Sequence, residues 1–238
     1  MVSDSHHHPQ RQPLGKRSYY IEKLAAERLK KVYALAPEPI QCYLAAEIEH
    51  VQVRLPADGR VLELGCGYGR VLKALAPQVN FLAGIDISYA SLRLARDYLA
   101  DSPDVMLAQM DALHLAFPPA TFDLVCCLQN GISAFQVDPH ALIAAAVAVV
   151  RPGGRVLFSS YADIFWEQRL DWFRLQAAHG LVGEIDEAAT GEGVIVCKDG
   201  FRATTVSPDQ FQALAQGLGR HVAIEIVADA SVFCDIQL

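Results

Sequence analysis

The stretch that decides the fold reads Val61-Leu62-Glu63-Leu64-Gly65-Cys66-Gly67-Tyr68-Gly69-Arg70. An apolar segment runs into glycines at alternate positions, which predicts a strand, a tight loop and then a helix. Glycine permits positive φ and lets backbone N–H and C=O groups contact a ligand. A dinucleotide-binding G-x-G-x-x-G loop would need glycine at position 70. Because Arg70 stands there, the pattern argues against a nicotinamide dehydrogenase.

Two aspartates close the next two predicted strands. Gly84-Ile85-Asp86-Ile87-Ser88 ends the second strand, and Asp86 lies 21 residues after Gly65. A carboxylate at that position can accept two hydrogen bonds from ribose hydroxyls. Asp111, followed by Ala112, ends the third strand. Its carboxylate could accept a hydrogen bond from an adenine amino group, and the next backbone N–H could reach a ring nitrogen.

Strands and helices alternate through this part of the chain, which implies parallel strands joined by right-handed crossovers. The predicted strands are 61–64, 81–86, 105–110, 122–128 and 155–160, and the predicted helices are 70–76, 88–100 and 138–149. The fourth strand is nearly all apolar, as a strand buried on both faces should be. Its neighbours Cys126 and Cys127 should therefore point to opposite faces of the sheet.

The flanking segments follow other patterns. Residues 1–17 are polar, contain His6-His7-His8, and are expected to form a flexible tail. Ser207-Pro208-Asp209-Gln210 is a capping box that opens a helix, and Lys198-Asp199-Gly200 is a hairpin turn. The other expected elements are helices 20–36, 39–48, 162–179 and 207–218, a hairpin over 194–206, and strands 221–227 and 231–237, which pair antiparallel at the sheet edge.

Composition limits the class of protein. The chain has 238 residues, of which 52% are hydrophobic and 20% charged, so it is long and apolar enough to bury a sizeable core. The net charge is −7, but residues 1–31 carry +4 and residues 32–238 carry −11. An acidic body argues against a surface built wholly for nucleic acid. The basic N-terminal segment is either a solvated helix face or a binding arm.

The six cysteines, at positions 42, 66, 126, 127, 197 and 234, form no C-x-x-C pair. They are therefore expected to be reduced thiols in a reducing compartment. No N-terminal apolar stretch resembles a signal peptide, and no apolar run reaches the roughly 18 residues of a membrane span. The sequence therefore predicts a cytoplasmic protein with no membrane partner.

These residues together resemble the class I S-adenosylmethionine-dependent methyltransferases, especially the broad methyltransferase type 11 group. Residues 63–69 look like the family's E-x-G-x-G-x-G motif, and Asp86 stands where its ribose-binding acid stands. Residues 122–125 resemble its fourth strand, and Val150-Arg151-Pro152-Gly153-Gly154 resembles its entry to strand five, with valine for the usual leucine. The close resemblance covers about residues 55–160. It implies an α/β, Rossmann-like, doubly wound and mostly parallel seven-stranded sheet, with an antiparallel edge strand, N-terminal helices and an inserted hairpin.

The resemblance also implies a division of the chain and a set of site residues. After the tail, residues 18–238 would form a single methyltransferase domain, with a helical lid at 18–53, a cofactor-binding core at 54–160 and an acceptor side at 161–238. Glu63 would stay ionised and orient the glycine loop. The expected cofactor-binding residues are Glu63, Gly65, Cys66, Gly67, Asp86, Ile87, Asp111, Ala112, Leu128 and Gln129. The expected acceptor-side residues are Asn130, Tyr161 and Tyr20, with Trp166, His114 and His179 as further candidates.

The sequence gives less information about the methyl acceptor. Leu128-Gln129-Asn130-Gly131 follows the fourth strand and matches neither the D/N-P-P-Y/F motif of adenine amine methyltransferases nor the Pro-Cys nucleophile of cytosine enzymes. We therefore expect methyl transfer from S-adenosylmethionine to the N, O or S atom of a small molecule, with no metal, no nucleic acid and no assigned catalytic base. The alternatives are an RNA or protein methyltransferase that uses the basic N-terminal arm, and a protein that binds the cofactor without turnover.

Overall fold

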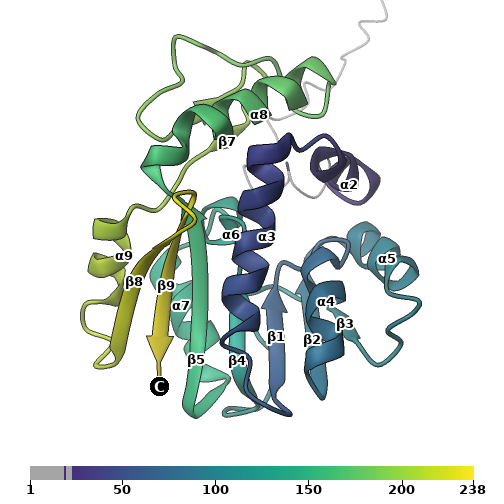
Figure 1. Ribbon diagram of the computed structural model, residues 1–238, viewed down its shortest axis with the longest axis vertical. Coiled ribbons are helices and arrows are strands. Elements are labelled where there is room, and N and C mark those ends of the chain that lie inside the picture. Colours follow the sequence, from purple (N-terminus) through teal and green to yellow (C-terminus); the bar gives the residue numbers. More distant parts are fainter. Residues whose placement is uncertain (1–18, 20–22) are drawn as a thin grey trace, which may run out of the picture.

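The computed structural model describes residue 19 and residues 23–238. Its centre is a seven-stranded sheet of order β3-β2-β1-β4-β5-β9-β8. Figure 1 shows these strands side by side. Strands β1 to β5 are parallel, whereas β9 is antiparallel to both of its neighbours. The predicted fold class is confirmed. The strands are Arg60–Leu64 (β1), Phe81–Asp86 (β2), Met106–Gln109 (β3), Phe122–Cys127 (β4), Val150–Tyr161 (β5), His221–Val227 (β8) and Ser231–Gln237 (β9).

Helices cover both faces of the sheet because the crossovers change sides where the strand order reverses, between β1 and β4. Figure 1 shows α3 in front of the strands and α7 behind them. The front helices are Glu38–Gln52 (α3), Arg70–Leu75 (α4) and Tyr89–Tyr98 (α5), and the back helices are Gly131–Ala134 (α6), Pro139–Ala148 (α7) and Pro208–Ala215 (α9). Strand β4 is buried along its whole length. Cys126 belongs to the front core and Cys127 to the back core, as the alternation along a strand predicts.

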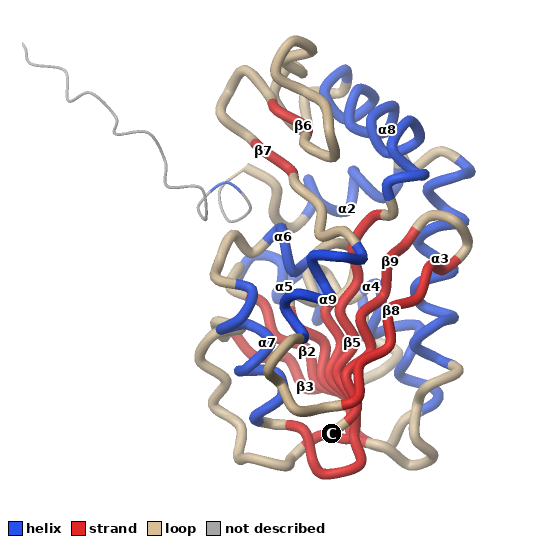
Figure 2. The backbone as a smooth tube through the Cα atoms, turned by 90° about the vertical axis from the view of Figure 1, so that its left-hand side faces the viewer, coloured by secondary structure: helices blue, strands red, loops and turns tan. Residues whose placement is uncertain are grey.

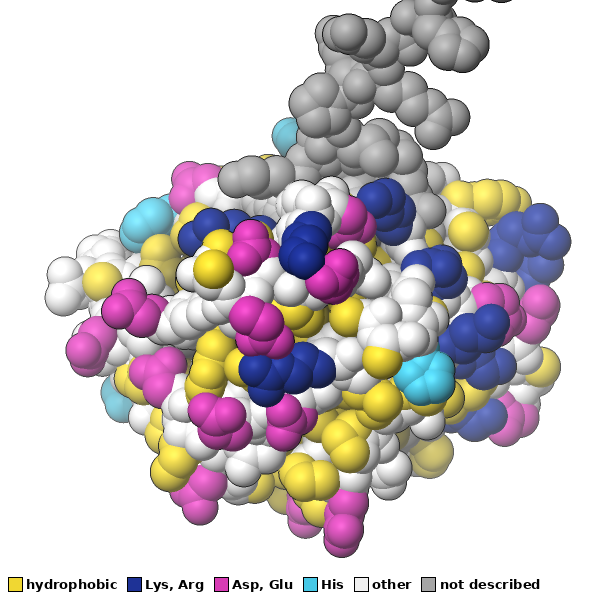
Figure 3. All heavy atoms as spheres, turned by 90° about the horizontal axis from the view of Figure 1, so that it is seen from above, with side chains coloured by type: hydrophobic (Ala, Val, Ile, Leu, Met, Phe, Trp, Pro, Cys, Tyr) yellow, Lys and Arg dark blue, Asp and Glu magenta, His cyan; other side chains and the backbone are white. Residues whose placement is uncertain are grey.

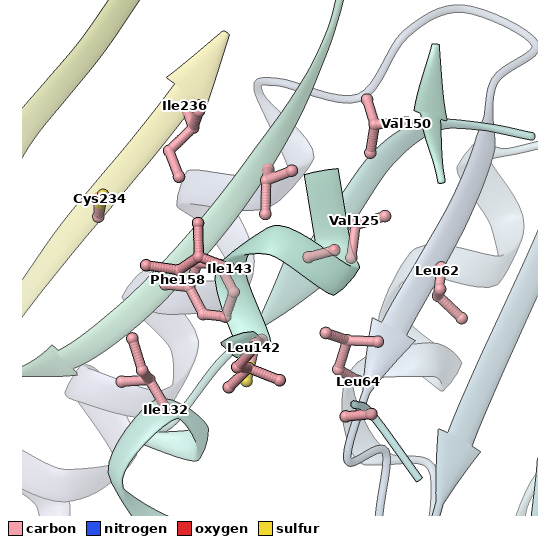
Figure 4. Packing of buried hydrophobic residues seen from close by; sticks show 14 of the residues in the cluster. Leu62, Leu64, Val125, Ile132, Leu142, Ile143, Val150, Phe158, Cys234 and Ile236 are labelled. Carbon is pink, nitrogen blue, oxygen red and sulfur yellow. The ribbon is translucent and has the colours of Figure 1, made fainter. Parts of the chain in front are cut away.

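The back core joins the strands to α6 and α7. Figure 4 shows Leu142 and Ile143 of α7 directed at Val125 of β4 and Phe158 of β5. All four side chains are almost fully buried. Burial of each such side chain contributes about 1.5–3 kcal/mol to the free energy of folding. This packing fixes the carboxyl ends of the strands against one another.

The predicted helix starts are confirmed by their caps. The Ser88 Oγ accepts a hydrogen bond from the Ser91 N–H at 3.2 Å, and Asp138 accepts one from the His140 N–H at 3.1 Å. Ser207 and Gln210 exchange hydrogen bonds of 3.2 and 2.8 Å in a complete capping box. Each cap is worth about 1 kcal/mol, because it satisfies a backbone donor that the helix cannot.

A second layer lies above the carboxyl ends of the strands. It contains α2 (Glu27–Ala34), α8 (Trp166–Ala178) and a small hairpin of β6 (Ile195–Val196) and β7 (Arg202–Ala203). Figures 1 and 2 both show these elements over the top of the sheet. A separate apolar cluster holds them together and includes Tyr43, Tyr161 and Trp172. We call this layer the upper lobe.

Several boundaries differ from the sequence predictions. Helix α2 begins at Glu27, because Ala26 has φ 50° and breaks the helical path. Helix α3 continues to Gln52, beyond the apolar pattern that ends at Ile48, and β5 begins at Val150 rather than at 155. The hairpin strands have only two residues each, and α6 was not predicted. The predicted tail at 1–17, with His6-His7-His8, lies outside the described residues.

The six cysteines are all described, and none of them forms a disulfide. Among the described residues, no helix combines the length and the apolar character needed to cross a membrane. The division of residues 18–238 into lid, core and acceptor side stays a prediction.

Candidate active site

A cavity of about 220 Å³ lies between the carboxyl ends of the parallel strands and the upper lobe. Its floor comes from the β1–α4 loop and the residues that follow β2, β3 and β4, and its roof comes from α2, α8 and the hairpin. All ten predicted cofactor-binding residues line this cavity: Glu63, Gly65, Cys66, Gly67, Asp86, Ile87, Asp111, Ala112, Leu128 and Gln129. Asn130 and Tyr161 line it too, whereas Tyr20 lies outside the described residues.

The β1–α4 loop depends on glycine. Gly65 has φ +73°, and a Cβ atom added there would lie 2.5 Å from the Phe135 ring, so no larger residue fits without displacing that ring. The N–H groups of Gly65 and Cys66 both donate to the Ile85 carbonyl, at 2.8 and 2.9 Å. These two N–H groups are therefore used within the protein, and the predicted contact of the 65–69 loop with a ligand stays a prediction. The loop gives a ligand close access to the backbone.

Asp86 holds the loop in place. One of its carboxylate oxygens accepts the Gly67 N–H at 2.9 Å, and the other accepts the Ser88 N–H at 2.7 Å. These bonds lower the pKa of Asp86, but burial has the larger effect and raises it. Asp86 therefore fixes the position of Gly67 in the loop. The predicted role of Glu63 in orienting the loop stays a prediction.

Glu63, which is buried, and Arg70, which is partly buried, lie near each other beside this loop. Burial raises the pKa of Glu63 to about 8, although the nearby Arg70 guanidinium lowers it. The expectation that Glu63 is ionised in the cofactor-bound site stays a prediction. The Oε2 of Glu63 and the Nε and Nη2 of Arg70 have no hydrogen-bond partner among the described residues. Sequence reasoning used Arg70 only to exclude a dinucleotide motif and missed this placement.

The loop after β3 supplies the next part of the wall. The Asp111 carboxylate accepts the Leu113 N–H at 3.0 Å, and its other oxygen lies 3.5 Å from Nδ1 of His114. The His114 side chain is 81% exposed and does not line the cavity, and neither do Trp166 and His179. These three candidates are not part of the described site.

The turn after β4 connects the floor of the cavity to its roof. Gln129 and Asn130 both have left-handed backbones, with φ of 54° and 61°. The Gln129 N–H donates to Glu47 Oε2 and to Ser159 Oγ, both at 2.9 Å. Glu47 is fully buried and also accepts the Ser231 hydroxyl at 2.6 Å. Strand β5, strand β9 and helix α3 therefore all fix this turn.

The side chains of the same turn are also fixed. The Tyr33 hydroxyl donates to Gln129 Oε1 at 2.5 Å, while Gln129 Nε2 has no partner among the described residues. Asn130 accepts the Ser160 hydroxyl at 2.9 Å and donates to the Thr204 carbonyl at 2.7 Å. Both ends of the Asn130 amide are thus used within the protein, which gives this predicted acceptor residue a role in joining β4 to the hairpin.

The roof of the cavity is mostly aromatic. Tyr161 stacks on Tyr43 with ring centroids 4.9 Å apart, and Trp172, Phe173 and Phe201 complete the wall. Sequence reasoning noted aromatic residues within 161–173 but assigned none of these last three. It also missed Gln176, which lies one helical turn after Trp172, is 2% exposed and lines the cavity. The i, i+4 spacing from Trp172 was the available signal.

Comparisons with known proteins show which proteins this chain resembles. Residues 61–154 match the family model of a methyltransferase domain. This segment is therefore similar to methyltransferase domains, as the glycine motif within it predicts. It is 35% identical over 114 residues to a ubiquinone biosynthesis O-methyltransferase of Thiobacillus denitrificans, covering 46% of this chain and 48% of that protein. The chain spans about half the length of the curated relatives it matches.

Solved structures share the fold of this chain over most of its length. The crystal structure of the PH0226 protein of Pyrococcus horikoshii OT3 has a TM-score of 0.63 and 21% identity, over 94% of this chain and 99% of that one. A SAM-dependent methyltransferase of Methanosarcina mazei has a TM-score of 0.57 and 19% identity, over 79% of this chain and 95% of that one. At these identities the likeness concerns the fold.

The residues present fit S-adenosylmethionine, the cofactor that the sequence motif predicts. S-adenosylmethionine has an amino-acid end that carries both an ammonium and a carboxylate. The unpartnered oxygen of Glu63 could accept a hydrogen bond from the ammonium. The unpartnered nitrogens of Arg70 could donate to the carboxylate. Asp86 stands at the end of β2 with lone pairs left for hydroxyl groups.

We expect the affinity of the protein for S-adenosylhomocysteine to depend on pH through Glu63. The pKa of the free protein's Glu63 is about 8, and a bound ammonium would lower it, so binding releases a proton below pH 8. The Kd should therefore rise as the pH falls from 8 to 6, by at most about tenfold per pH unit. Titration calorimetry in buffers of different ionisation enthalpy measures both the Kd and the proton release.

The Glu63→Gln variant has no proton to release and should bind more weakly, with a Kd that stays flat over this range. Asp104→Asn, a change at an exposed carboxylate outside the cavity, is the matched control. A wild-type Kd that does not change between pH 6 and 8, without proton release, would contradict the assignment of Glu63.

Proposed function

We propose that the protein transfers a methyl group from S-adenosylmethionine to a small-molecule acceptor. The observation that carries the proposal is the Glu63–Arg70 pair, unpartnered at its cavity-side atoms, beside a glycine loop within the methyltransferase match. Buried polar atoms without hydrogen-bond partners cost free energy. A ligand with a zwitterionic end removes that cost.

Each part of the cofactor has a matching group. Glu63 would hold the ammonium and Arg70 the carboxylate of the amino-acid end. Asp86 would accept the ribose hydroxyls, while Asp111 and the Ala112 N–H would hold the adenine. The bound cofactor supplies an electrophilic methyl group on a sulfonium. No residue is assigned as a general base.

The protein would contribute alignment and exclusion of water. The turn at Gln129 and Asn130 is held from three elements, so the residues next to the transfer position move little. The aromatic roof and α2 cover the cavity, and desolvation strengthens the electrostatic interactions inside it. Alignment of two reactants can supply about 7–11 kcal/mol of a barrier in favourable cases.

The character of the acceptor is supported by two observations. The curated relatives include ubiquinone biosynthesis O-methyltransferases, whose printed name describes a small-molecule pathway and an oxygen acceptor. Two of the four described basic residues of the N-terminal segment, Lys23 and Arg28, bind other parts of the protein. Lys23 pairs with Asp199 at 3.0 Å, and Arg28 donates to the carbonyls of Gly180 and Leu181 at 2.7 and 3.0 Å.

The distribution of charged side chains on the face above the cavity also favours a small acceptor. Figure 3 shows Lys and Arg interspersed with Asp and Glu on this face, without one continuous basic surface around the described residues. A polymer with many phosphates would favour a basic surface. A small acceptor is therefore our proposal over RNA, and the absence of nucleic-acid and membrane partners stays a prediction.

We predict that S-adenosylhomocysteine stabilises the protein and that NAD does not. Ligand at 100 times its Kd should raise the free energy of unfolding by about 2.7 kcal/mol, and the Tm by roughly 5–11 °C for a chain of this size. Asp86→Ala should lose most of this shift, whereas Asp104→Ala should keep it. A shift with NAD and none with S-adenosylhomocysteine in a thermal scan would overturn the proposed function.

We also propose that residues 23–35 act as a lid. The predicted lid reached residue 53, but α3 packs into the front core through Val51 and into the upper lobe through Ile40 and Tyr43. The lid is therefore restricted to the segment before Pro37. Tyr33 and Leu29 of α2 line the cavity, so closure of this segment would complete the wall and its opening would admit the substrates.

Hydrogen exchange with and without S-adenosylhomocysteine tests this lid. Amides of residues 27–35 should gain protection on binding, because the ligand favours the closed position. Amides of α3 should be strongly protected in both states. Equal, strong protection of both segments without ligand would mean that α2 is permanently packed.

A further inference from the structure

Strand β8 forms one edge of the seven-stranded sheet. It pairs with β9 on one side, and no described strand pairs with it on the other. Figure 1 shows β8 as the outermost strand on the left of the sheet, and Figure 2 looks toward this edge. Every second residue of β8 therefore directs its N–H and C=O groups away from β9. Such an edge can pair with a strand of another chain.

The β8 edge lacks the features that usually prevent pairing. Edge strands in soluble proteins are commonly short, or carry Lys, Pro or a bulge. Strand β8 has seven residues without Lys or Pro and pairs with β9 in an uninterrupted register. Its only carboxylate, that of Glu225, is held by Arg54 at 2.9 Å. The opposite edge, β3, has only four residues, so β8 is the edge more open to a partner.

One face of β8 carries an apolar row of alternate residues, Val222, Ile224 and Ile226. Val222 and Ile224 pack against the back core, to which Phe211 of helix α9 also belongs. Ile226 lies on the same face but outside that cluster, and it is 49% exposed. The row therefore ends in an isoleucine that the described part of the chain leaves half uncovered.

This row is complementary to itself. If two β8 strands pair antiparallel about a two-fold axis at Ile224, each Val222 lies opposite the partner's Ile226, and Ile224 lies opposite its own copy. Three apolar cross-strand pairs then follow one another on this face. On the other face, Ala223 lies opposite the partner's Glu225, so the two carboxylates do not oppose each other.

The same register brings opposite charges together at the ends of the strands. Arg220 directly precedes β8, and Asp229 lies in the turn that follows it. Both are exposed, and neither forms an ion pair with another described residue. In this register Arg220 lies opposite the partner's Ala228, one residue from the partner's Asp229. Because a two-fold interface repeats every contact, this attraction occurs twice.

The neighbouring antiparallel registers are less favourable. A pairing centred on Glu225 places the two Glu225 carboxylates directly opposite, which is destabilising. A pairing centred on Ala223 places Ile226 opposite the partner's Arg220. The register centred on Ile224 avoids both conflicts.

We propose that two copies of this chain pair through β8, antiparallel and centred on Ile224, so that one continuous sheet crosses a symmetric dimer. An interface built on one strand pair is small, so we expect a reversible dimer with a micromolar Kd. Because the paired strands run antiparallel, the carboxyl ends of the two sheets face opposite directions. The two cavities therefore lie at opposite ends of the dimer, and the inference does not depend on the proposed function.

Sedimentation velocity of the full chain, from low micromolar to several hundred micromolar, tests the dimer. We expect a monomer–dimer equilibrium in the wild type. Ile226→Lys places a charge in the apolar row and should raise the dimer Kd at least about tenfold. Because Ile226 is half exposed, this variant should keep the Tm of the wild-type monomer. Met106→Lys makes the same kind of change on β3, at a side chain that is 38% exposed, and should leave the dimer Kd unchanged.

A charge exchange tests the register. Arg220→Glu places two acidic groups near each other at each end of the interface and should raise the dimer Kd by about threefold or more. Adding Asp229→Arg restores opposite charges and should return the Kd to near the wild-type value. A pairing through another surface predicts no such recovery.

Three results would overturn the proposal. They are a wild type that stays monomeric over the whole concentration range, a dimer that Ile226→Lys does not weaken, and a charge exchange without recovery. The Kd for S-adenosylhomocysteine should be the same for the wild type and Ile226→Lys, because the cavities lie away from β8. Failure of a dimeric protein to bind S-adenosylhomocysteine would contradict the proposed function and leave the dimer supported.

Discussion

The hydrogen bonds between Glu47 and the turn at Gln129 are the constraint on which the site depends. Two consecutive residues without glycine's freedom adopt left-handed backbones there, which costs about 1–3 kcal/mol each. The buried Glu47 carboxyl and the Ser159 hydroxyl accept the Gln129 N–H. Hydrogen bonds of this kind, about 1.5–3 kcal/mol when a charged group takes part, are of the size needed to offset that strain.

This turn lies between the cofactor-side residues of the cavity and its aromatic roof. Below it, the glycine loop, Asp86 and the Glu63–Arg70 pair belong to the segment that matches the methyltransferase family. Above it, α2, α8 and the hairpin supply the aromatic roof. Asn130 links these two regions through Ser160 and Thr204. A change in the upper lobe can thus alter the acceptor while the cofactor residues stay in place.

The sequence predicted the part of the site that local pattern determines. The strands β2, β8 and β9 were placed to the residue, because glycine, aspartate and short turns mark their ends. The ten cofactor-side residues follow strand ends, and parallel strands bring their carboxyl ends to one edge. The same reasoning correctly placed the capping box at Ser207.

What could not be predicted depends on contacts between distant segments. Glu47 lies 82 residues before Gln129, and nothing in its helical neighbourhood marks it as buried. The pKa of Glu63 follows from burial by the folded upper lobe and front core. The sequence around Gln176 does not mark it as a cavity residue, because its place on the wall depends on how α8 packs over the cavity. The start of α2 at Glu27 follows from the left-handed backbone of Ala26, which is not a residue that favours this conformation.

The central claim is that Gln129 is held jointly by Glu47 from α3 and by Tyr33 from α2. A double-mutant cycle of Glu47→Gln and Tyr33→Phe, measured as the free energy of unfolding in urea, tests it most directly. The account predicts a coupling free energy of at least about 1 kcal/mol, because both changes act on one turn. The control cycle of Tyr33→Phe with the exposed Glu49→Gln should be additive. Additivity within about 0.3–0.5 kcal/mol in the Glu47 cycle would contradict the claim.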